Sequence, residues 1–200
     1  MGAVVLGLAA CGGGGERQDA DEPEGEFPVD VVTAKFPNRQ GLAETTDLRL
    51  GVENTGTEAI PDLAVTIFLD DDPAAGPFGI RLDQPGLANP NRPVWVLEEK
   101  YPRLAGESKP VGSAPGDVAQ PNTFAFGRLE PDERREMVWR VSPVHGGTYA
   151  VNYEIAASVT GKAEAVTADG SPPTGKFVVT IATKPPRARV NDAGQVELHE

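Results

Sequence analysis

The chain has 200 residues with a formal net charge of −12, and it contains 23 glycines and 19 prolines. This length suits one domain with tails. The acidic excess argues against a nucleic-acid binder, which needs a basic face against phosphate, and against electrostatic attraction to anionic lipid head groups. Short runs rich in valine and threonine lie between the glycines and prolines, and no long stretch after the leader has a helical period. The composition therefore predicts an all-β protein.

The chain opens with an apolar segment, residues 1–10, followed by Cys11, its only cysteine. The run Leu8-Ala9-Ala10-Cys11 resembles the lipobox of bacterial lipoproteins. In that family small residues precede a cysteine whose thiol is joined to a diacylglycerol, and acyl chains such as palmitate hold the cleaved protein to the membrane. The resemblance implies that residues 1–10 form a signal peptide and that Cys11 is lipidated. It also implies an extracytoplasmic protein, anchored to the cell membrane of a bacterium.

This leader departs from the family in one respect. No Lys or Arg precedes Arg17, whereas a secretory leader opens with a basic region. We expect the true start to lie upstream of Met1; the alternative is a short apolar N-terminus with an accidental cysteine. An apolar run this short cannot cross a bilayer as a helix. Residues 11–26 are rich in glycine and acids, and are expected to form a flexible linker ahead of a domain at residues 27–183.

The first strand is expected at 27–37, where the apolar face changes at Val31 and Val32 and predicts a β-bulge or a switch between sheets. Apolar residues then alternate from Leu48 to Val52 and from Leu63 to Leu69. We interpret these as two strands joined by a turn that begins at Asn54-Thr55-Gly56, with the rest of the domain built onto that pair.

A long loop insert follows at residues 70–120, in which only Val94–Leu97 has the pattern of a strand. Further strands are expected at 122–127, 137–141, 148–160 and 175–181, and a turn with Leu129 as its buried residue precedes the second of them. Residues 184–200 are polar and are expected to form a tail. The total is seven or eight strands in two packed antiparallel sheets.

Three segments carry a resemblance to immunoglobulin-like domains of bacterial envelope proteins, the cell-adhesion-related CARDB type above all. They are Leu48–Gly56, Leu129–Glu133 and Gly147–Val151. The resemblance implies an immunoglobulin-like β-sandwich in which Tyr149 forms a tyrosine corner. Val151 stands where antibody domains have a cysteine, so no inter-sheet disulfide is expected. The chain also resembles lipoproteins of high-G+C bacteria.

Four aromatic residues fall in or near the insert: Trp95, Tyr101, Phe124 and Phe126. If they are exposed together, they form a platform for a sugar or a partner protein. The alternative is that Trp95 and one phenylalanine pack into the sandwich. Recognition residues of sandwiches lie on loops, so the insert is where we expect a ligand or partner surface.

Catalysis has little support in the sequence. The chain has two histidines, His145 in a predicted turn and His199 in the predicted tail. A hydrolytic triad needs His145 beside a serine such as Ser142 or Ser158, and no Gly-x-Ser-x-Gly elbow is present. We therefore expect no enzyme activity and no cofactor.

A metal site is also not expected. Asp70, Asp71 and Asp72 could offer carboxylates to calcium, but the spacing of an EF-hand loop is missing, because Pro73 follows and no Glu stands at the twelfth position. The single cysteine and the isolated histidines give no zinc pattern.

Three functions remain open. The first is a non-catalytic recognition or scaffold module, anchored in the envelope through Cys11. The second is an enzyme, or the accessory domain of one, that acts on cell-wall glycan or peptide. The third is a subunit of an envelope complex that binds its partner by adding a strand to a sheet edge.

Overall fold

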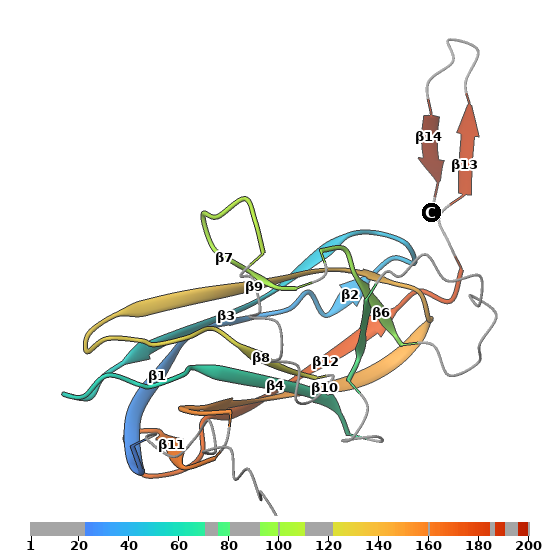
Figure 1. Ribbon diagram of the computed structural model, residues 1–200. Coiled ribbons are helices and arrows are strands. Elements are labelled where there is room, and N and C mark those ends of the chain that lie inside the picture. Colours follow the sequence, from blue (N-terminus) through green and yellow to red (C-terminus); the bar gives the residue numbers. More distant parts are fainter. Residues whose placement is uncertain are drawn as a thin grey trace, which may run out of the picture.

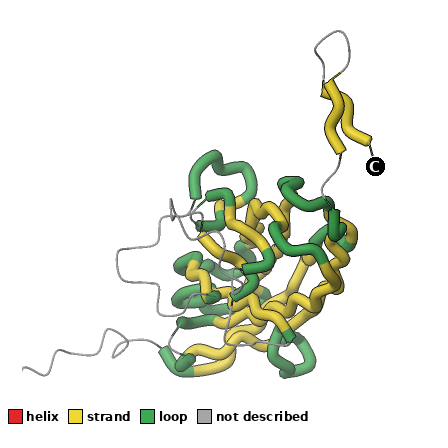
Figure 2. Tube along the Cα trace, turned by 90° about the vertical axis from the view of Figure 1, so that its right-hand side faces the viewer, coloured by secondary structure: helices red, strands yellow, loops and turns green. Residues whose placement is uncertain are grey.

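The computed structural model describes residues 23–70, 76–80, 93–99, 101–110, 122–159, 161–184, 187–190 and 196–199. Every regular element in these ranges is a β-strand (Figure 2). The strands are β1 (Gly25–Lys35), β2 (Arg39–Gln40), β3 (Thr46–Asn54), β4 (Ala64–Leu69), β5 (Phe78–Ile80), β6 (Trp95–Leu97), β7 (Arg103–Leu104), β8 (Thr123–Ala125), β9 (Arg134–Pro143), β10 (Gly147–Ala156), β11 (Ala163–Val166), β12 (Thr174–Ile181), β13 (Arg187–Val190) and β14 (Val196–His199). No helix long and apolar enough to cross a membrane occurs among these residues.

Two sheets pack face to face (Figure 1). The seven-stranded sheet has the order β11-β1-β3-β9-β6-β5, with β7 also paired to β9, and the five-stranded sheet has the order β2-β12-β10-β4-β8. The all-β sandwich predicted from the sequence is confirmed. Most pairs are antiparallel, but β1–β11, β5–β6 and β12–β2 are parallel, and all three lie at the ends of the sheets. The strand count exceeds the predicted seven or eight because several edge strands have only two to four residues.

The apolar residues that alternate along the sequence are buried in the core, as predicted. Leu48, Leu50 and Val52 of β3 are fully buried, and so are Val65 and Ile67 of β4. Both strands are internal to their sheets, since β3 lies between β1 and β9 and β4 lies between β10 and β8. Their alternation therefore reports burial against one shared core.

The predicted pairing of these two strands is wrong. β3 and β4 belong to opposite sheets, so the turn after Asn54 carries the chain across the core and does not close a hairpin. A period of two specifies which face of a strand is buried but not which strand lies beside it. Two strands that face each other across a core satisfy the same pattern as two neighbours in one sheet.

The bulge predicted at Val31 and Val32 is present. The register of β1 against β3 shifts between Val31 and Thr33. The shift keeps Phe27 and Val29 before it, and Phe36 after it, in the core. At this point Thr33 faces Gly51, where an added Cβ would lie 2.9 Å from the Thr33 Cβ. Gly51 therefore allows the bulged strand to approach β3 closely.

The predicted insert contributes three short strands to the larger sheet. β6 and β7 both pair with the edge of β9 opposite to β3, and β5 pairs with β6. Only β6 was predicted, because β5 and β7 have three and two residues and carry no readable periodicity. The strands of the sandwich run from Gly25 to Ile181.

The stretch predicted as a polar tail contains a hairpin. β13 and β14 pair in antiparallel fashion, with Arg187 opposite His199 and Val190 opposite Val196. Figure 1 shows this hairpin beyond one end of the sandwich. The alternation of Arg187, Ala188, Arg189 and Val190 is a strand signal, but a weak one in so short a segment.

Candidate functional site

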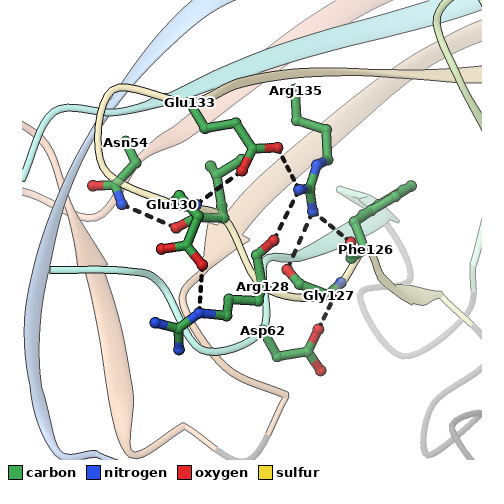
Figure 3. A network of polar contacts seen from close by, with 9 residues as sticks. Asn54, Asp62, Phe126, Gly127, Arg128, Glu130, Glu133 and Arg135 are labelled. Atoms are coloured by element: carbon green, nitrogen blue, oxygen red, sulfur yellow. Dashed lines mark hydrogen bonds and ion pairs between the residues drawn. The ribbon is translucent and has the colours of Figure 1, made fainter.

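The turn segment at 126–133 is held by a network of polar contacts (Figure 3). Asn54 is fully buried, and its amide nitrogen donates to the carbonyls of Glu58 at 2.9 Å and of Leu129 at 3.1 Å. Its side-chain oxygen accepts from the Gly56 amide at 3.0 Å. Asp132 donates its amide to the Asn54 carbonyl at 2.9 Å and has a φ of 60°, a conformation that Asp and Asn adopt more readily than most residues.

Arg135 closes the same segment from the other side. Its guanidinium donates to the carbonyls of Phe126 at 2.6 Å and of Arg128 at 2.8 Å, and to the Glu133 carboxylate at 2.5 Å (Figure 3). The second oxygen of Glu133 accepts from the Glu130 amide at 2.9 Å, and this bond, followed by the contact with Arg135, lowers the pKa of Glu133. Because these donors and acceptors pair with one another, we assign the network a structural role. It holds the turn that connects β8 of the smaller sheet to β9 of the larger sheet.

The aromatic residues predicted as a binding platform are mostly inside the sandwich. Trp95 is fully buried, and its ring lies against those of Phe36, Phe78 and Tyr149 at centroid separations of 5.5 to 6.2 Å. Its indole N–H donates to the side-chain oxygen of Gln40 at 2.7 Å. Trp95 therefore offers no exposed ring to a ligand.

The other three belong to a second cluster. Phe124 and Phe126 are buried and pack edge-on against Trp139, each at 5.6 Å. Tyr101 lies over both phenylalanines, and its hydroxyl accepts from the Ala125 amide at 2.7 Å and donates to the Ala125 carbonyl at 3.0 Å. These two bonds occupy backbone groups on the edge of β8 opposite to β4. The exposed platform does not form, because burial of large rings stabilises the core.

The tyrosine corner implied by the family resemblance is present. The Tyr149 hydroxyl donates to the Gly146 carbonyl, three residues upstream, at 3.2 Å. Val151, which stands in the position of the antibody cysteine, is fully buried. Apolar packing therefore occupies the place of the inter-sheet disulfide.

The serines considered for a triad are engaged elsewhere. The Ser142 hydroxyl lies 3.0 Å from the Thr45 hydroxyl, and the Ser158 hydroxyl accepts from the Gly161 amide at 3.1 Å. His145 lies in the turn between β9 and β10, as predicted, and its amide donates to the Val94 carbonyl. His199 lies in β14.

The predicted lipidation site and most of the aspartate cluster lie outside the described residues, namely Cys11, Asp71 and Asp72. Asp70 pairs with Lys176 at 2.5 Å and accepts from Asn152 at 2.6 Å, and these two contacts lower its pKa. In the part of the chain that the structure describes, no group of three or more His, Cys, Asp or Glu residues is placed to hold a metal ion.

A shallow cleft of about 390 Å³ lies on the outer face of the larger sheet, over β1, β3 and β9. It is lined by Lys35, Pro37, Thr45, Thr46, Asp47, Arg49 and Arg140. Three cations against one carboxylate make this lining basic in a protein whose net charge is −12. The cleft has no signature in the sequence, because Lys35, Arg49 and Arg140 come together only when the three strands are in register.

Asp47 organises the charges of the cleft. One of its oxygens accepts from Arg49 at 2.9 Å, a bond that raises the pKa of Arg49, and the other lies 3.8 Å from an Arg140 nitrogen. Arg49 also contacts Glu136 at 3.4 Å. The Lys35 side chain makes no ion pair or hydrogen bond within the described ranges. The cleft thus holds Arg49 between two carboxylates, Arg140 in a long ion pair with Asp47, and Lys35 without an ion pair within the described ranges.

A second exposed feature is the outer edge of β12. β10 pairs with all eight residues of β12, whereas β2 covers the opposite edge only at Thr180 and Ile181. The Thr180 amide donates outward to Asn38 at 2.8 Å, so by alternation the N–H and C=O groups of Lys176 and Val178 face the same edge. No described strand pairs with them. Val178 is 59 % exposed, more than any other large apolar side chain in the described ranges.

No protein-family model matches the chain, and no curated protein sequence is significantly similar to it. Among solved structures, the chain is similar to a CARDB domain from Pyrococcus furiosus, with 12% sequence identity, a TM-score of 0.41 and coverage of 78% of this chain and 87% of that one. It is also similar to a cohesin module of a Clostridium perfringens family 33 glycoside hydrolase, with 13% identity, a TM-score of 0.42 and coverage of 79% and 98%. Part of the alpha-2-macroglobulin of Escherichia coli has 13% identity and a TM-score of 0.40, over 82% of this chain and 18% of that one. These likenesses are too distant to carry a function, so the case for one depends on the contacts of this chain's own residues.

Proposed function

We propose that the protein is a non-catalytic recognition or scaffold module of the bacterial envelope, anchored through a lipid on Cys11, and that it binds an extended segment of another envelope protein along the open edge of β12. The observation that carries the proposal is this edge. The backbone groups of Lys176 and Val178 face outward without a partner strand among the described residues, beside the exposed side chain of Val178.

An open edge supports binding for a physical reason. Unpaired N–H and C=O groups in a row form a template for one more strand, and folded proteins usually block such edges. This chain blocks one of them, since the Tyr101 hydroxyl occupies the amide and carbonyl of Ala125 on β8. The β12 edge has no comparable cover within the described ranges. A strand added there gains main-chain hydrogen bonds and an apolar contact with Val178.

The net charge favours a partner that differs from this chain. Two copies would bring together two chains of net charge −12, and self-repulsion opposes that association. An extended segment of another protein avoids the penalty. The anchor at Cys11 would hold the module at the membrane surface, where such partners are found.

Edge binding is tested with a photo-crosslinker at position 176 in cells, which leaves Val178 in place, followed by hydrogen exchange on the purified wild-type complex. We expect a crosslinked partner, and we expect the amides of Lys176 and Val178 to become protected. Val178→Pro removes an outward-facing amide without breaking the ladder to β10, so it should abolish the crosslinked complex. Val159→Pro is the matched control, because Val159 is the other exposed large apolar residue of the described ranges, is 37 % exposed and lies outside β12. This variant should leave binding intact.

Three outcomes contradict the edge proposal: crosslinking between two copies, a complex that survives Val178→Pro, or a wild-type complex in which the amides of Lys176 and Val178 stay unprotected. The anchor is tested separately. Cys11→Ala should release the protein from membranes, and mass spectrometry of the wild type should find an acylated Cys11. A variant that still fractionates with membranes contradicts the lipid anchor and leaves the edge proposal unaffected.

A further inference from the structure

We infer that the cleft over β1, β3 and β9 is a binding site for an oxyanion, a phosphate or carboxylate group carried by a small ligand, held by Lys35, Arg49 and Arg140. This site is separate from the β12 edge, which belongs to the other sheet. Its volume of about 390 Å³ lies at the lower end of the range for small-molecule pockets.

The strand register places two cations of the cleft side by side. Lys35 lies directly opposite Arg49 on the neighbouring strand, and Asp47 lies directly opposite Arg140. Like charges in directly opposite positions of a sheet repel each other and destabilise the pairing. The sequence nevertheless places two cations there, and Lys35 has no acidic partner in the described ranges. A bound anion would convert this repulsion into attraction.

Arg49 is also fixed in place by two carboxylates. Its two terminal nitrogens contact Asp47 at 2.9 Å and Glu136 at 3.4 Å, and these contacts hold the guanidinium in place in the lining of the cleft. An arginine held by carboxylates loses less side-chain entropy when a ligand binds to its remaining donors. Arg140 lies 3.8 Å from Asp47, too far for a hydrogen bond, so its planar fork is available for bidentate contact with an oxyanion.

The net charge of the side chains around the cleft indicates the chemical class of the ligand. The three cations exceed Asp47 and Glu136 by one charge, which suits one anionic group rather than a polyanion. The strongly acidic remainder of the protein repels long anionic polymers, so attraction is confined to the cleft within about one Debye length, roughly 8 Å at physiological ionic strength. Pro37 and the threonines of the lining leave room for an uncharged substituent beside the anion.

The test is a titration of the full-length protein with inorganic phosphate and, in a second arm, with acetate, followed by heteronuclear NMR at constant ionic strength. We expect saturable shifts for residues of β1, β3 and β9 in at least one arm, and the arm that saturates at lower concentration identifies phosphate or carboxylate as the preferred group. Lys35→Gln and Arg140→Gln should each weaken binding about tenfold, because each removes charge-assisted hydrogen bonds.

Arg128→Gln is the matched control, since it removes the same charge from an exposed arginine that does not line the cleft. It should change the affinity less than twofold. Thermal unfolding of all three variants checks that the fold is intact. Shifts that grow linearly without saturation in both arms, or an equal loss of affinity in Arg128→Gln and Arg140→Gln, overturn the site.

Discussion

The hydroxyl of Tyr101 bonds to both backbone groups of Ala125, accepting from its amide at 2.7 Å and donating to its carbonyl at 3.0 Å. One side chain from the insert thus replaces the strand that would otherwise pair with β8. Edges left open are sites of aggregation, so this contact protects the fold as well as stabilising it.

Tyr101→Phe keeps the ring against Phe124 and Phe126 but leaves the amide and carbonyl of Ala125 without these bonds. We expect a loss of about 1–3 kcal/mol in the free energy of unfolding, measured in urea, together with faster aggregation. Tyr149→Phe is the control, because its hydroxyl donates to the Gly146 carbonyl, which lies in a turn and not on a strand edge of the described residues. Equal aggregation of the two variants contradicts the edge-protection role.

Asn54 is the polar residue on which the crossing between the sheets depends. Asn54→Ala removes three hydrogen bonds from a fully buried site and leaves the carbonyls of Glu58 and Leu129 without these donors. We expect a loss of about 2–4 kcal/mol in urea unfolding, since buried groups left unpaired carry their desolvation penalty.

Asn54→Asp should be worse than Asn54→Ala, because a carboxylate would face two carbonyl oxygens. The control is Asn152→Ala, whose amide donates on the surface to Asp70. It should change stability by less than about 0.5 kcal/mol. If Asn54→Ala and Asn152→Ala are equally stable, the network at the turn does not hold the crossing.

Acid should weaken the joint between Glu133 and Arg135. The pKa of Glu133 is lowered in the fold from its ordinary value of 4.5, first by the Glu130 amide and then by Arg135. A carboxylate with a lowered pKa stabilises the fold above its unfolded pKa, and this contribution is lost as the pH falls through the folded pKa. The loss therefore begins near pH 4.5 and continues below it.

Glu133→Gln separates this effect from the titration of other acids. We expect the wild type to be more stable than the variant at pH 7 and the difference to shrink as the pH falls below 4.5, as measured by thermal unfolding at several pH values. A difference that stays constant from pH 7 to pH 3 shows that the charge of Glu133 does not contribute.

The strands that could be read from the sequence are those that bury one face. The alternation of Leu48, Leu50 and Val52 identifies β3, and the change of face at Val31 and Val32 identifies the bulge in β1, because side-chain direction alternates strictly along a strand. The tyrosine corner at Tyr149 was implied by the resemblance of Gly147–Val151 to immunoglobulin-like domains. These features depend on neighbours in the chain.

The aromatic residues show what local sequence patterns cannot predict. The local sequence around Trp95 and Phe124 is the same whether these rings line a surface or a core. Their burial depends on residues distant in sequence, because Trp95 packs against Phe36 and Tyr149 and Phe124 packs against Trp139. The Tyr101 contact joins residues 24 positions apart and has no signature in either segment.

The amino-acid sequence alone determined the all-β class, the inward faces of the long strands and the acidic character of the protein, because each depends on composition or on a period of two. Only the tertiary structure decided that β3 and β4 lie in opposite sheets, that no described strand covers β12 at Lys176 and Val178, and that Lys35, Arg49 and Arg140 line one cleft. Strand order and register depend on which segments pair across the whole chain, and the free energy that selects them comes from packing between residues distant in sequence.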